Sequence, residues 1–409
     1  MLTRVRAGAT AINPALGLLA FIAFIAQVGI AVMLPLLPLF ATQLGATPFV
    51  LGLLTSLFAV TNGIGQLGVG LLSDRYGSRR FIAGGLALYS SMNALIATAA
   101  SAVWLVAWRG LSGFGGGALI VSERIYLTEI TAPERRAFAN GILSAAASAG
   151  MVTGPAFGGL IAAVGGLRAP FIVVAVTSAI AFVASLALPH GRRIFSGTTA
   201  EPPTAGEPAK QDAPSREDAP STGGIVALLL ANLAMLAGYG AFITTYAPLA
   251  TERLGWTTVE VGMAFSFFGA GSIVLGPPLS HLADRTSRKG VAIAGTVPVA
   301  AFGMALVVGL PIWAVFMTAI GAGAGLTAFN ASWYALLADV SGAATRGRTF
   351  GIVSAVSNTG IVIGATTAAQ LWERLDIGVA MASGVVAILL AMIPLSLFHA
   401  PGRDDATTA

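Results

Sequence analysis

The feature that most constrains this chain is an internal repeat with a constant offset of 210 residues. At this offset Asp74 corresponds to Asp284, and Arg75 corresponds to Arg285. Such an offset in an apolar chain indicates a duplicated membrane unit, whose two similar halves face each other across a central site. Further pairs with this offset are Pro38 and Pro248, Leu44-Gly45 and Leu254-Gly255, Gly113 and Gly323, Gly115 and Gly325, Glu129 and Asp339, Gly150 and Gly360, and Gly154 and Gly364.

The composition requires lipid as the solvent for most of the chain. Apolar residues make up 56% of the sequence and charged residues only 10%, whereas soluble domains carry about 25% charged residues. Cysteine is absent, which excludes disulfides and thiolate metal sites, and we expect no metal and no other cofactor. The basic residues are scattered at helix ends instead of forming one face, so we expect no nucleic-acid partner.

Twelve apolar stretches are long enough to cross a bilayer, since a hydrocarbon core of about 30 Å needs about 20 helical residues. Arg4 and Arg6 precede the first stretch, which ends without a small-residue cleavage site, so we expect a retained helix rather than a signal peptide. The expected spans are 15–40, 49–72, 81–100, 103–127, 138–164 and 169–188 in the first half, and 224–249, 258–282, 290–309, 312–338, 348–371 and 377–398 in the second.

The distribution of Lys and Arg predicts the orientation of these spans, because basic residues accumulate in cytoplasmic loops. With the N-terminus inside, Arg168, Arg253 and Arg374 lie in outside segments, and Arg109 and Arg124 lie within the fourth span. All other Lys and Arg residues of the 22 lie in inside segments. We therefore expect both termini to be cytoplasmic.

A polar segment at 196–224 interrupts the apolar pattern between the sixth and seventh spans, where the repeat predicts a seam. Its composition cannot bury enough surface to fold, so we expect a disordered cytoplasmic linker that acts as a tether; the alternative is a regulatory segment. The predicted domains are an N-terminal six-helix bundle at 1–190, the linker at 191–223 and a C-terminal six-helix bundle at 224–409.

Polar side chains within the spans predict which helices surround a central pathway, since polar groups in a bilayer need a partner or a wet cavity. Spans six, nine and twelve carry no amide and no charge, so we expect them to face lipid. The Asn and Gln side chains of the other spans are expected to face this pathway. For each of them, the alternative is a hydrogen bond to a neighbouring helix without any contact to a transported molecule. The residues expected to surround a bound small molecule are Gln27, Asn62, Phe114, Tyr239, Phe242, Tyr246, Asn330, Trp333 and Asn358.

Residues 70–80, with the sequence GLLSDRYGSRR, resemble the loop between spans two and three of the major facilitator superfamily. The second copy at 282–289, LADRTSRK, lacks both glycines. An Asp at a cytoplasmic helix end can accept from a facing helix N-terminus and pair with Arg, which predicts a conformational latch; the alternative is a basic loop that only fixes the topology. The residues assigned to this cytoplasmic gate are Gly70, Asp74, Arg75, Gly77, Arg79, Glu129, Arg136, Asp284, Arg285, Asp339 and Arg346.

Two glycine- and proline-containing motifs carry the resemblance further. Gly150-x-x-x-Gly154-Pro155-x-x-Gly158-Gly159 resembles the fifth-helix motif of drug:proton antiporters, and Gly29-x5-Pro35-x-x-Pro38 resembles the first-helix motif of their twelve-span branch. The glycines allow neighbouring helices to approach closely and the prolines allow a helix to bend; the alternative is a packing role alone. The residues assigned to helix bending are Pro35, Pro38, Gly150, Gly154, Pro155, Gly158 and Gly159.

The fourth span carries a buried charge. Arg109-x-x-x-Gly113-x-Gly115 resembles the fourth-helix signature of the superfamily, which implies that Arg109 takes part in proton transfer or holds the charge network of the cavity. The alternative is a structural Arg satisfied by helix carbonyls or a polar neighbour.

This sequence departs from many exporters of cations, because its first span carries no carboxylate. Glu123 is the only acid well inside a span, about 21 Å along the helix from Arg109 and within about 40° of the same face. It can serve as a proton site, or it can form a structural ion pair with Arg124. Arg109, Glu123 and Arg124 are the candidate proton and charge network, and this departure puts proton coupling and cationic substrates in question.

The resemblance implies an all-α membrane protein of the major facilitator fold, with twelve transmembrane helices in two pseudo-symmetric six-helix bundles. It implies a monomeric secondary transporter of the cytoplasmic (inner) membrane, which exports small amphiphilic molecules or drugs by alternating access in exchange for protons. The alternative is a metabolite, sugar or lipid facilitator or exporter of the same fold without proton coupling through Glu123. An intramembrane enzyme is not expected, because His190, His281 and His399 all lie at cytoplasmic edges.

Overall fold

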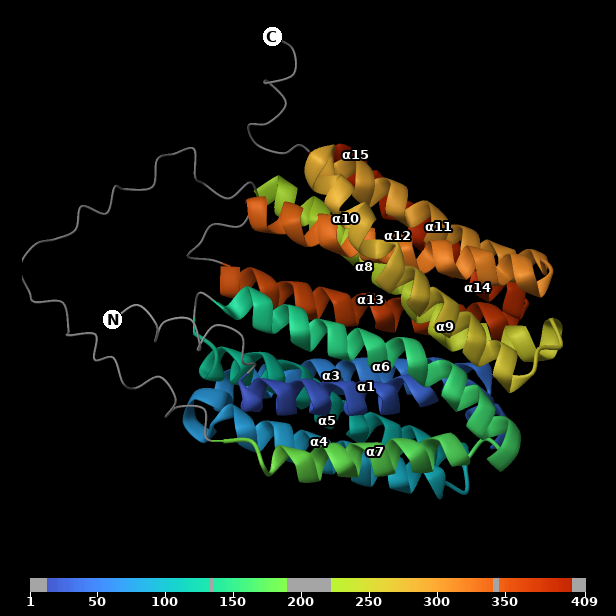
Figure 1. The fold of residues 1–409 in the computed structure, drawn as a ribbon. Helices are drawn as coiled ribbons and strands as arrows, with labels where there is room; N and C mark the ends of the chain where they lie inside the picture. The colour runs from blue at the N-terminus through green and yellow to red at the C-terminus, as the bar shows by residue number, and fades with distance from the viewer. Residues whose placement is uncertain (1–12, 133–134, 190–221, 341–345, 399–409) are drawn as a thin grey trace, which may run out of the picture.

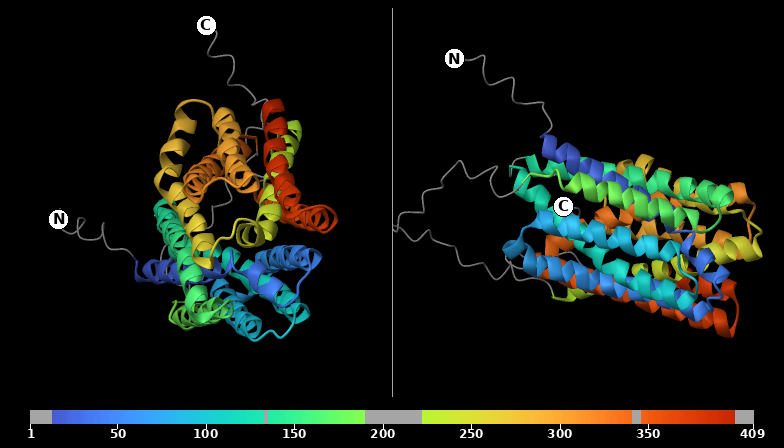
Figure 2. Two further views of the ribbon diagram at one scale, coloured as in Figure 1. Left: turned by 90° about the vertical axis from the view of Figure 1, so that its right-hand side faces the viewer. Right: turned by 90° about the horizontal axis from the view of Figure 1, so that it is seen from below.

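The computed structural model describes residues 13–132, 135–189, 222–340 and 346–398, and no β-strand occurs among them. The helices run roughly parallel in two groups, one above the other in Figure 1. The end-on view in Figure 2 separates the first half of the chain from the second half. The predicted all-α class with two bundles is confirmed. The predicted linker at 191–223 lies outside the described residues, apart from Thr222 and Gly223, which begin a helix.

The first bundle is held together by long helices that pack side by side. α3 packs against α5, α1 packs against α6 and α7, and α4 packs against α5 and α7. We call the end of the molecule at which α7 ends and α8 begins the linker end, and the opposite end the far end. The elements are α1 (Pro14–Met33), α2 (Leu37–Gln43), α3 (Pro48–Tyr76), α4 (Ser78–Ala97), α5 (Ala102–Ile130), α6 (Arg136–Gly165) and α7 (Ala169–Ser185).

The second bundle repeats this arrangement. α9 packs against α12, α8 against α13 and α14, and α11 against α12 and α14. The elements are α8 (Thr222–Pro248) with a π-helical turn at Leu249–Arg253, α9 (Thr258–Val274), α10 (Gly276–Arg285), α11 (Arg288–Val308), α12 (Ile312–Val340), α13 (Arg346–Arg374), α14 (Ile377–Leu390) and α15 (Met392–Leu397).

The helices match the twelve predicted spans. In the described part of the chain, eight helical segments are long and apolar enough to cross a membrane, and the bent pair of α9 and α10 makes a ninth. The remaining spans are α4, the 17-residue α7, and α13, which lie alongside the others (Figure 1). α7 shows the lipid-facing pattern clearly, because Ile172, Val176, Ile180 and Val183 are exposed along one side of it.

Three predicted spans are not continuous helices. The first, expected over 15–40, turns at 34–36, because Pro35 and Pro38 lack the backbone N–H that an unbroken helix needs. The eighth bends by 44° between α9 and α10, next to the Gly-Pro-Pro segment at 276–278. The twelfth is interrupted between α14 and α15.

The repeat also appears in the close approach of helix backbones. A Cβ placed on Gly85 of α4 would lie 2.9 Å from the carbonyl oxygen of Gly115 on α5, and one on Gly295 would lie 2.6 Å from that of Gly325. The offset of 210 residues relates these two contacts. Only glycine allows the two backbones to come this close.

Polar contacts at the linker end follow the same offset. In each half, the first two residues of the helix that follows the gate motif form polar contacts with two other helix ends. These are the ends of the fourth and sixth spans in the first half, and of the tenth and twelfth spans in the second. The corresponding pairs are Ser78–Glu129 with Arg288–Asp339, and Arg79–Leu186 with Lys289–Ser396.

The neighbouring glycines of α4 provide a matched test of this packing. Gly85→Ala should lower the free energy of unfolding by about 1–3 kcal/mol, because its Cβ meets the α5 backbone. Gly84→Ala should raise it by about 0.5–1 kcal/mol, because no atom lies within 4 Å of its Cβ and alanine favours the helix. Melting temperatures of the purified proteins in detergent compare the two variants. Equal stability would show that α4 and α5 do not pack as described.

Candidate functional site

The two bundles touch each other mainly through α6 with α9 and α3 with α13. These contacts are tightest toward the far end, where a Cβ on Gly159 would meet the backbone of Thr258 and one on Gly52 would meet the backbone of Ala365. Four hydrogen bonds join the bundles there, with Phe49 N donating to Glu373 Oε1 (3.0 Å), Ala156 N to Ser266 Oγ (3.1 Å), Thr258 Oγ1 to Gly159 O (3.2 Å) and Thr244 Oγ1 to Thr55 Oγ1 (3.4 Å). The molecule is therefore closed at the far end.

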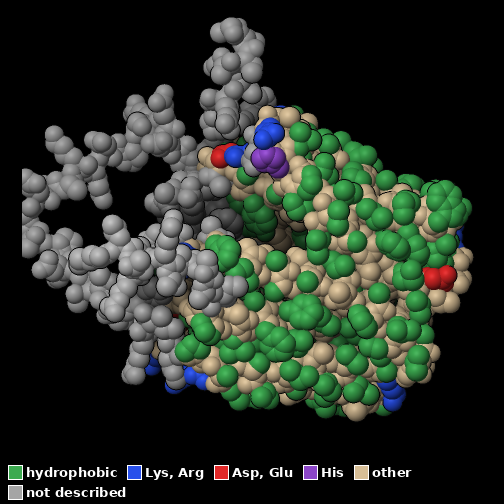
Figure 3. Space-filling view, in the orientation of Figure 1, with side chains coloured by type: hydrophobic (Ala, Val, Ile, Leu, Met, Phe, Trp, Pro, Cys, Tyr) green, Lys and Arg blue, Asp and Glu red, His purple; other side chains and the backbone are tan. Residues whose placement is uncertain are grey.

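A cavity of about 460 Å³ lies between the bundles. Most of its wall comes from the second bundle, and Leu34, Ser148, Met151 and Val152 close it from the first. Figure 3 shows the surface hollowed between the bundles next to the grey segments. In the same view charged side chains lie toward the two ends, whereas the surface between them is apolar.

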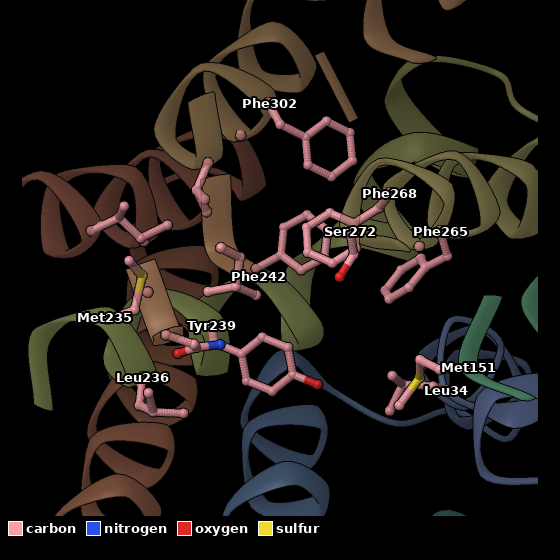
Figure 4. A pocket seen from close by; sticks show the side chains of 18 of the residues that line it. Leu34, Met151, Met235, Leu236, Tyr239, Phe242, Phe265, Phe268, Ser272 and Phe302 are labelled. Atoms are coloured by element: carbon pink, nitrogen blue, oxygen red, sulfur yellow. The ribbon is translucent and has the colours of Figure 1, made fainter. Parts of the chain in front are cut away.

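Six aromatic side chains, all from the second bundle, line this larger cavity. The ring of Phe242 lies 5.8 Å from that of Phe265 and 5.5 Å from that of Phe302, measured between centroids. Figure 4 shows these rings around the cavity, together with Phe268 and the hydroxyl of Ser272. A cavity of 300–1,000 Å³ with mostly apolar walls and few polar groups suits a drug-sized molecule.

A second cavity of about 130 Å³ lies beside the first. Leu34 and Tyr239 line both cavities, so the cavities adjoin at these two side chains. Figure 4 shows the hydroxyl of Tyr239 reaching toward Leu34 and Met151. Arg109, Asn62 and Asn358 are among the residues that line the smaller cavity.

Arg109 is nearly enclosed, with 4% of its surface exposed. Its guanidinium carbon lies 3.6 Å from the centroid of the Phe58 ring, and Nη1 lies 3.9 Å from the sulfur of Met33. Its Nε has no hydrogen-bond partner, and no ion pair among the described residues involves it. Among the described residues no helix carbonyl accepts from Arg109, whereas Tyr89 is a polar neighbour of its side chain, so the alternative of a structural Arg satisfied by a polar neighbour stays open.

The structure brings together five of the nine residues expected to surround a ligand. Tyr239, Phe242 and Asn330 line the larger cavity, and Tyr239, Asn62 and Asn358 line the smaller one. Tyr246 instead donates its hydroxyl to Val261 O at 2.8 Å, and Trp333 donates Nε1 to Leu228 O at 2.8 Å, both fully buried. Gln27 and Phe114 line neither cavity; they pack against glycines of neighbouring helices.

The expectation that spans nine and twelve face only lipid is wrong. α11 contributes Phe302, Val299 and Gly303 to the larger cavity, and α14 contributes residues from Met381 to Ile388. The cavity wall is apolar, so the absence of amides and charges does not exclude a helix from it. A sequence signal was available in Phe265 and Phe268, whose spacing places two rings on one face of α9.

Glu123 lies on α5, half-buried, with its Oε1 buried and without a hydrogen-bond partner. Arg124 is exposed, and no ion pair among the described residues joins it to Glu123. The alternative interpretation as a structural ion pair is therefore not supported by this conformation. Glu123 lines neither cavity.

The gate residues lie at the linker end, and several form contacts within their own bundle. Gly77 makes the turn between α3 and α4 with a φ of +84°, and Gly70, Arg75 and Arg285 are exposed. Arg136 Nη2 donates to Thr128 O at 3.4 Å. The side chains of Asp74, Asp284 and Arg346 lie outside the described part of the structure. Arg79 donates to Leu186 O, Glu129 accepts from the Ser78 hydroxyl, and Asp339 accepts from Arg288.

The glycines of the fifth-helix motif all lie at helix crossings. A Cβ on Gly150, Gly154 or Gly158 would meet α1, and one on Gly159 would meet α9. α6 is continuous through Pro155, whose carbonyl lies against Gly262 of α9. The motif thus joins α6 to its own bundle and to the opposite bundle.

Comparisons with known proteins agree with this architecture. The chain matches the Major Facilitator Superfamily over residues 19–226 and 228–409. Quinolone resistance protein NorA of Staphylococcus aureus (strain MSSA476) is 25% identical over 261 residues, which are 63% of this chain and 65% of that protein. Multidrug resistance protein 2 of Bacillus subtilis (strain 168) is 29% identical over 182 residues, 43% of this chain and 45% of that protein. The chain thus spans less than two thirds of the length of these curated relatives.

Solved structures resemble the whole chain. A bacterial homolog to the human lysosomal transporter Spinster, in an inward-facing and occupied conformation, aligns with a TM-score of 0.72 and 16% identity, covering 95% of this chain and 96% of that chain. A mutant of the nucleoside transporter NupG aligns with a TM-score of 0.75 and 12% identity, covering 94% and 99%. At these identities the likeness establishes the fold alone.

Substitutions of two acidic residues at the far end test whether a helix cap between the bundles holds that end closed. Glu373→Gln should weaken closure, because Glu373 caps the N-terminus of α3 from the other bundle, an interaction of about 0.3–1 kcal/mol. Glu260→Gln is the matched control, because Glu260 caps only its own helix. Since the chain has no cysteine, spin labels on introduced cysteines at Thr98 and Leu310 report the distance between the bundles. Identical distance distributions for the two variants would contradict this role.

Proposed function

Because the chain belongs to the Major Facilitator Superfamily of membrane transporters, we propose that it exports small amphiphilic molecules or drugs by alternating access, in exchange for protons. The predicted major facilitator fold is confirmed, and the chain is an integral membrane transporter of small molecules rather than an enzyme. Our proposal adds the substrate class, the export direction and the exchange with protons.

The observation that carries the proposal is the larger cavity. Its volume of about 460 Å³ and its aromatic wall suit an apolar body of drug size, and Asn232, Asn330 and Ser272 place a few polar groups in that wall. The lining is mostly apolar, which favours an amphiphile over a sugar or a nucleoside. The names of the relatives, one for quinolone resistance and one for multidrug resistance, support the same substrate class.

The difference between the two ends supports alternating access. The far end is closed by helix crossings at glycine and by a few hydrogen bonds, whereas the surface is hollowed between the bundles near the linker end (Figure 3). In the opposite state the far end opens, and the gate residues at the linker end close the pathway. A ligand drives the exchange only through its different affinity for the two states.

The orientation proposed is the one that places both termini and the linker end in the cytoplasm. The excess of Lys and Arg in the segments at this end supports it, because such residues are retained on the cytoplasmic side. We also propose a monomer in the cytoplasmic membrane, with residues 191–223 as a tether between domains at 1–190 and 224–409. The hollow then faces the cytoplasm, where an exporter collects its substrate.

Proton exchange is assigned to Glu123. Its Oε1 has no partner in this conformation, and a carboxylate on α5 can take up a proton when water reaches it from one side and release it when water reaches it from the other. The alternative function is a facilitator of the same fold without coupling through Glu123, and transport under a pH gradient distinguishes the two.

Adjacent phenylalanines of α9 test the substrate site. Phe268 lines the larger cavity, whereas Phe267 packs against Phe316 with ring centroids 4.8 Å apart. Phe268→Leu should change the substrate range or lower the affinity for aromatic substrates several-fold, and Phe267→Leu should leave both as in the wild type. The measurement is uptake of a panel of neutral, cationic and anionic amphiphiles into proteoliposomes. Equal profiles for both variants would place the substrate elsewhere.

Glu123→Gln tests the coupling. Accumulation driven by a pH gradient should fall at least tenfold, because the amide cannot exchange a proton, while exchange of substrate down its own gradient continues. Glu252→Gln is the control, since Glu252 is exposed at the far end. Both activities are measured in the same proteoliposomes, with and without an imposed pH gradient. Full gradient-driven transport by Glu123→Gln would support the uncoupled alternative or another proton carrier.

A further inference from the structure

We propose that the smaller cavity is an anion subsite, in which Arg109 binds a carboxylate of the transported molecule while the apolar body of that molecule fills the larger cavity. This inference rests on the proposed function and specifies its substrate class. The substrates are then amphiphilic acids, with a negatively charged group a few bonds away from an aromatic or aliphatic body.

The first observation is that the charge of Arg109 has no counter-ion. The side chain is 96% enclosed by the protein, yet its contacts are a thioether, an aromatic ring and neutral polar groups. The titratable side chains that interact with it are Tyr89 and Tyr239, and phenols are neutral near pH 7. A buried guanidinium without an anion is unfavourable, because its lost hydration is not replaced.

No acid in the described part of the chain is placed to supply that anion. Glu123 lies about 21 Å along the same helix from Arg109. At the far end, Glu373 accepts from Phe49 N and Asp376 pairs with Arg253 at 3.0 Å. At the linker end, Asp339 pairs with Arg288. Within the described residues the charge of Arg109 is thus left for an anion from outside the protein to compensate.

The second observation is the form of the smaller cavity. Its 130 Å³ is several times the roughly 30 Å³ that a water molecule occupies, so a carboxylate fits. Arg109 lines this cavity, and a guanidinium binds a carboxylate through two parallel hydrogen bonds. Asn62 and Asn358 line the same cavity with amide groups, which can act as further donors.

The third observation is the junction of the two cavities. Leu34 and Tyr239 belong to both linings, so a ligand that passes between them places its body among Phe242, Phe265 and Phe302 and its charged end at Arg109. Among the described residues that line the two cavities, none is acidic. A cation would meet Arg109 and find no compensating carboxylate, so the site discriminates against cations as well as attracting anions.

Three probes with one apolar body measure this preference: 4-biphenylcarboxylic acid, 4-biphenylcarboxamide and (4-biphenylmethyl)trimethylammonium. Binding to the purified protein is measured by calorimetry in nanodiscs of neutral phosphatidylcholine, with empty nanodiscs as the blank. The wild type should bind the carboxylate at least tenfold more tightly than the amide, because charge-assisted hydrogen bonds are the stronger ones. It should bind the cation most weakly.

Variants separate the charge of Arg109 from its structural role. Arg109→Gln should bring the ratio of the amide and carboxylate dissociation constants to about one, and Arg109→Lys should retain part of it. Asn358→Asp keeps Arg109 in place and puts a carboxylate in the same cavity, so it should also abolish the preference even if Arg109→Gln does not fold. Asn140→Asp, which adds the same charge outside both cavities, should leave the ratio as in the wild type.

The possible outcomes distinguish this inference from the function on which it rests. Equal affinity of the wild type for the carboxylate and the amide, or tighter binding of the cation, would overturn the anion subsite and leave the amphiphile exporter standing. An unchanged carboxylate preference in both Arg109→Gln and Asn358→Asp would also overturn it. Failure of all three probes to bind the wild type would overturn the larger cavity as an amphiphile site, and the anion subsite with it.

Discussion

The bilayer offers no hydrogen bonds to the helices that cross it, and the rest of this structure follows from that constraint. The bundles are held by close backbone contact, which glycine permits at the points where helices cross. Gly158 lies against the backbone of Val32, and Gly113 and Gly323 lie against Phe58 and Phe268 in the two halves. Polar side chains are left for the helix ends and for the space between the bundles. A polar group that is neither at an end nor paired therefore marks the pathway.

Arg109 is the clearest case of such a group. It lies on α5 about two turns from the start of the helix, and its contacts include the sulfur of Met33 and the ring of Phe58. A cation over an aromatic ring gains about 0.5–2 kcal/mol, which is small beside the cost of removing a charge from water. The cavity next to it gives the charge a route to water or to a ligand. The buried charge of Arg109 is thus tolerated because water or a ligand can reach it through the cavity.

The sequence predicted the fold well, because the repeat and the apolar stretches reflect constraints that act along the chain. It predicted the site less well, because the direction of a side chain depends on packing between helices. Trp333 and Tyr246 have the right depth, but their rings are enclosed and their polar atoms bond to Leu228 and Val261. Phe302 belongs to the ninth span, which is expected to face lipid because it carries no amide and no charge, yet Phe302 lines the larger cavity. An apolar residue that faces lipid and one that faces a ligand look the same in a sequence.

The two bundles contribute unequally to the two cavities. The second bundle supplies most of the aromatic wall, whereas Arg109 and Asn62 belong to the first bundle. The four hydrogen bonds that close the far end contribute about 1 kcal/mol each, so closure there can be reversed. A ligand that fills both cavities touches both bundles and binds differently when the bundles move apart at one end or the other. Division of the site between the bundles is therefore what allows a ligand to shift the balance between the two states.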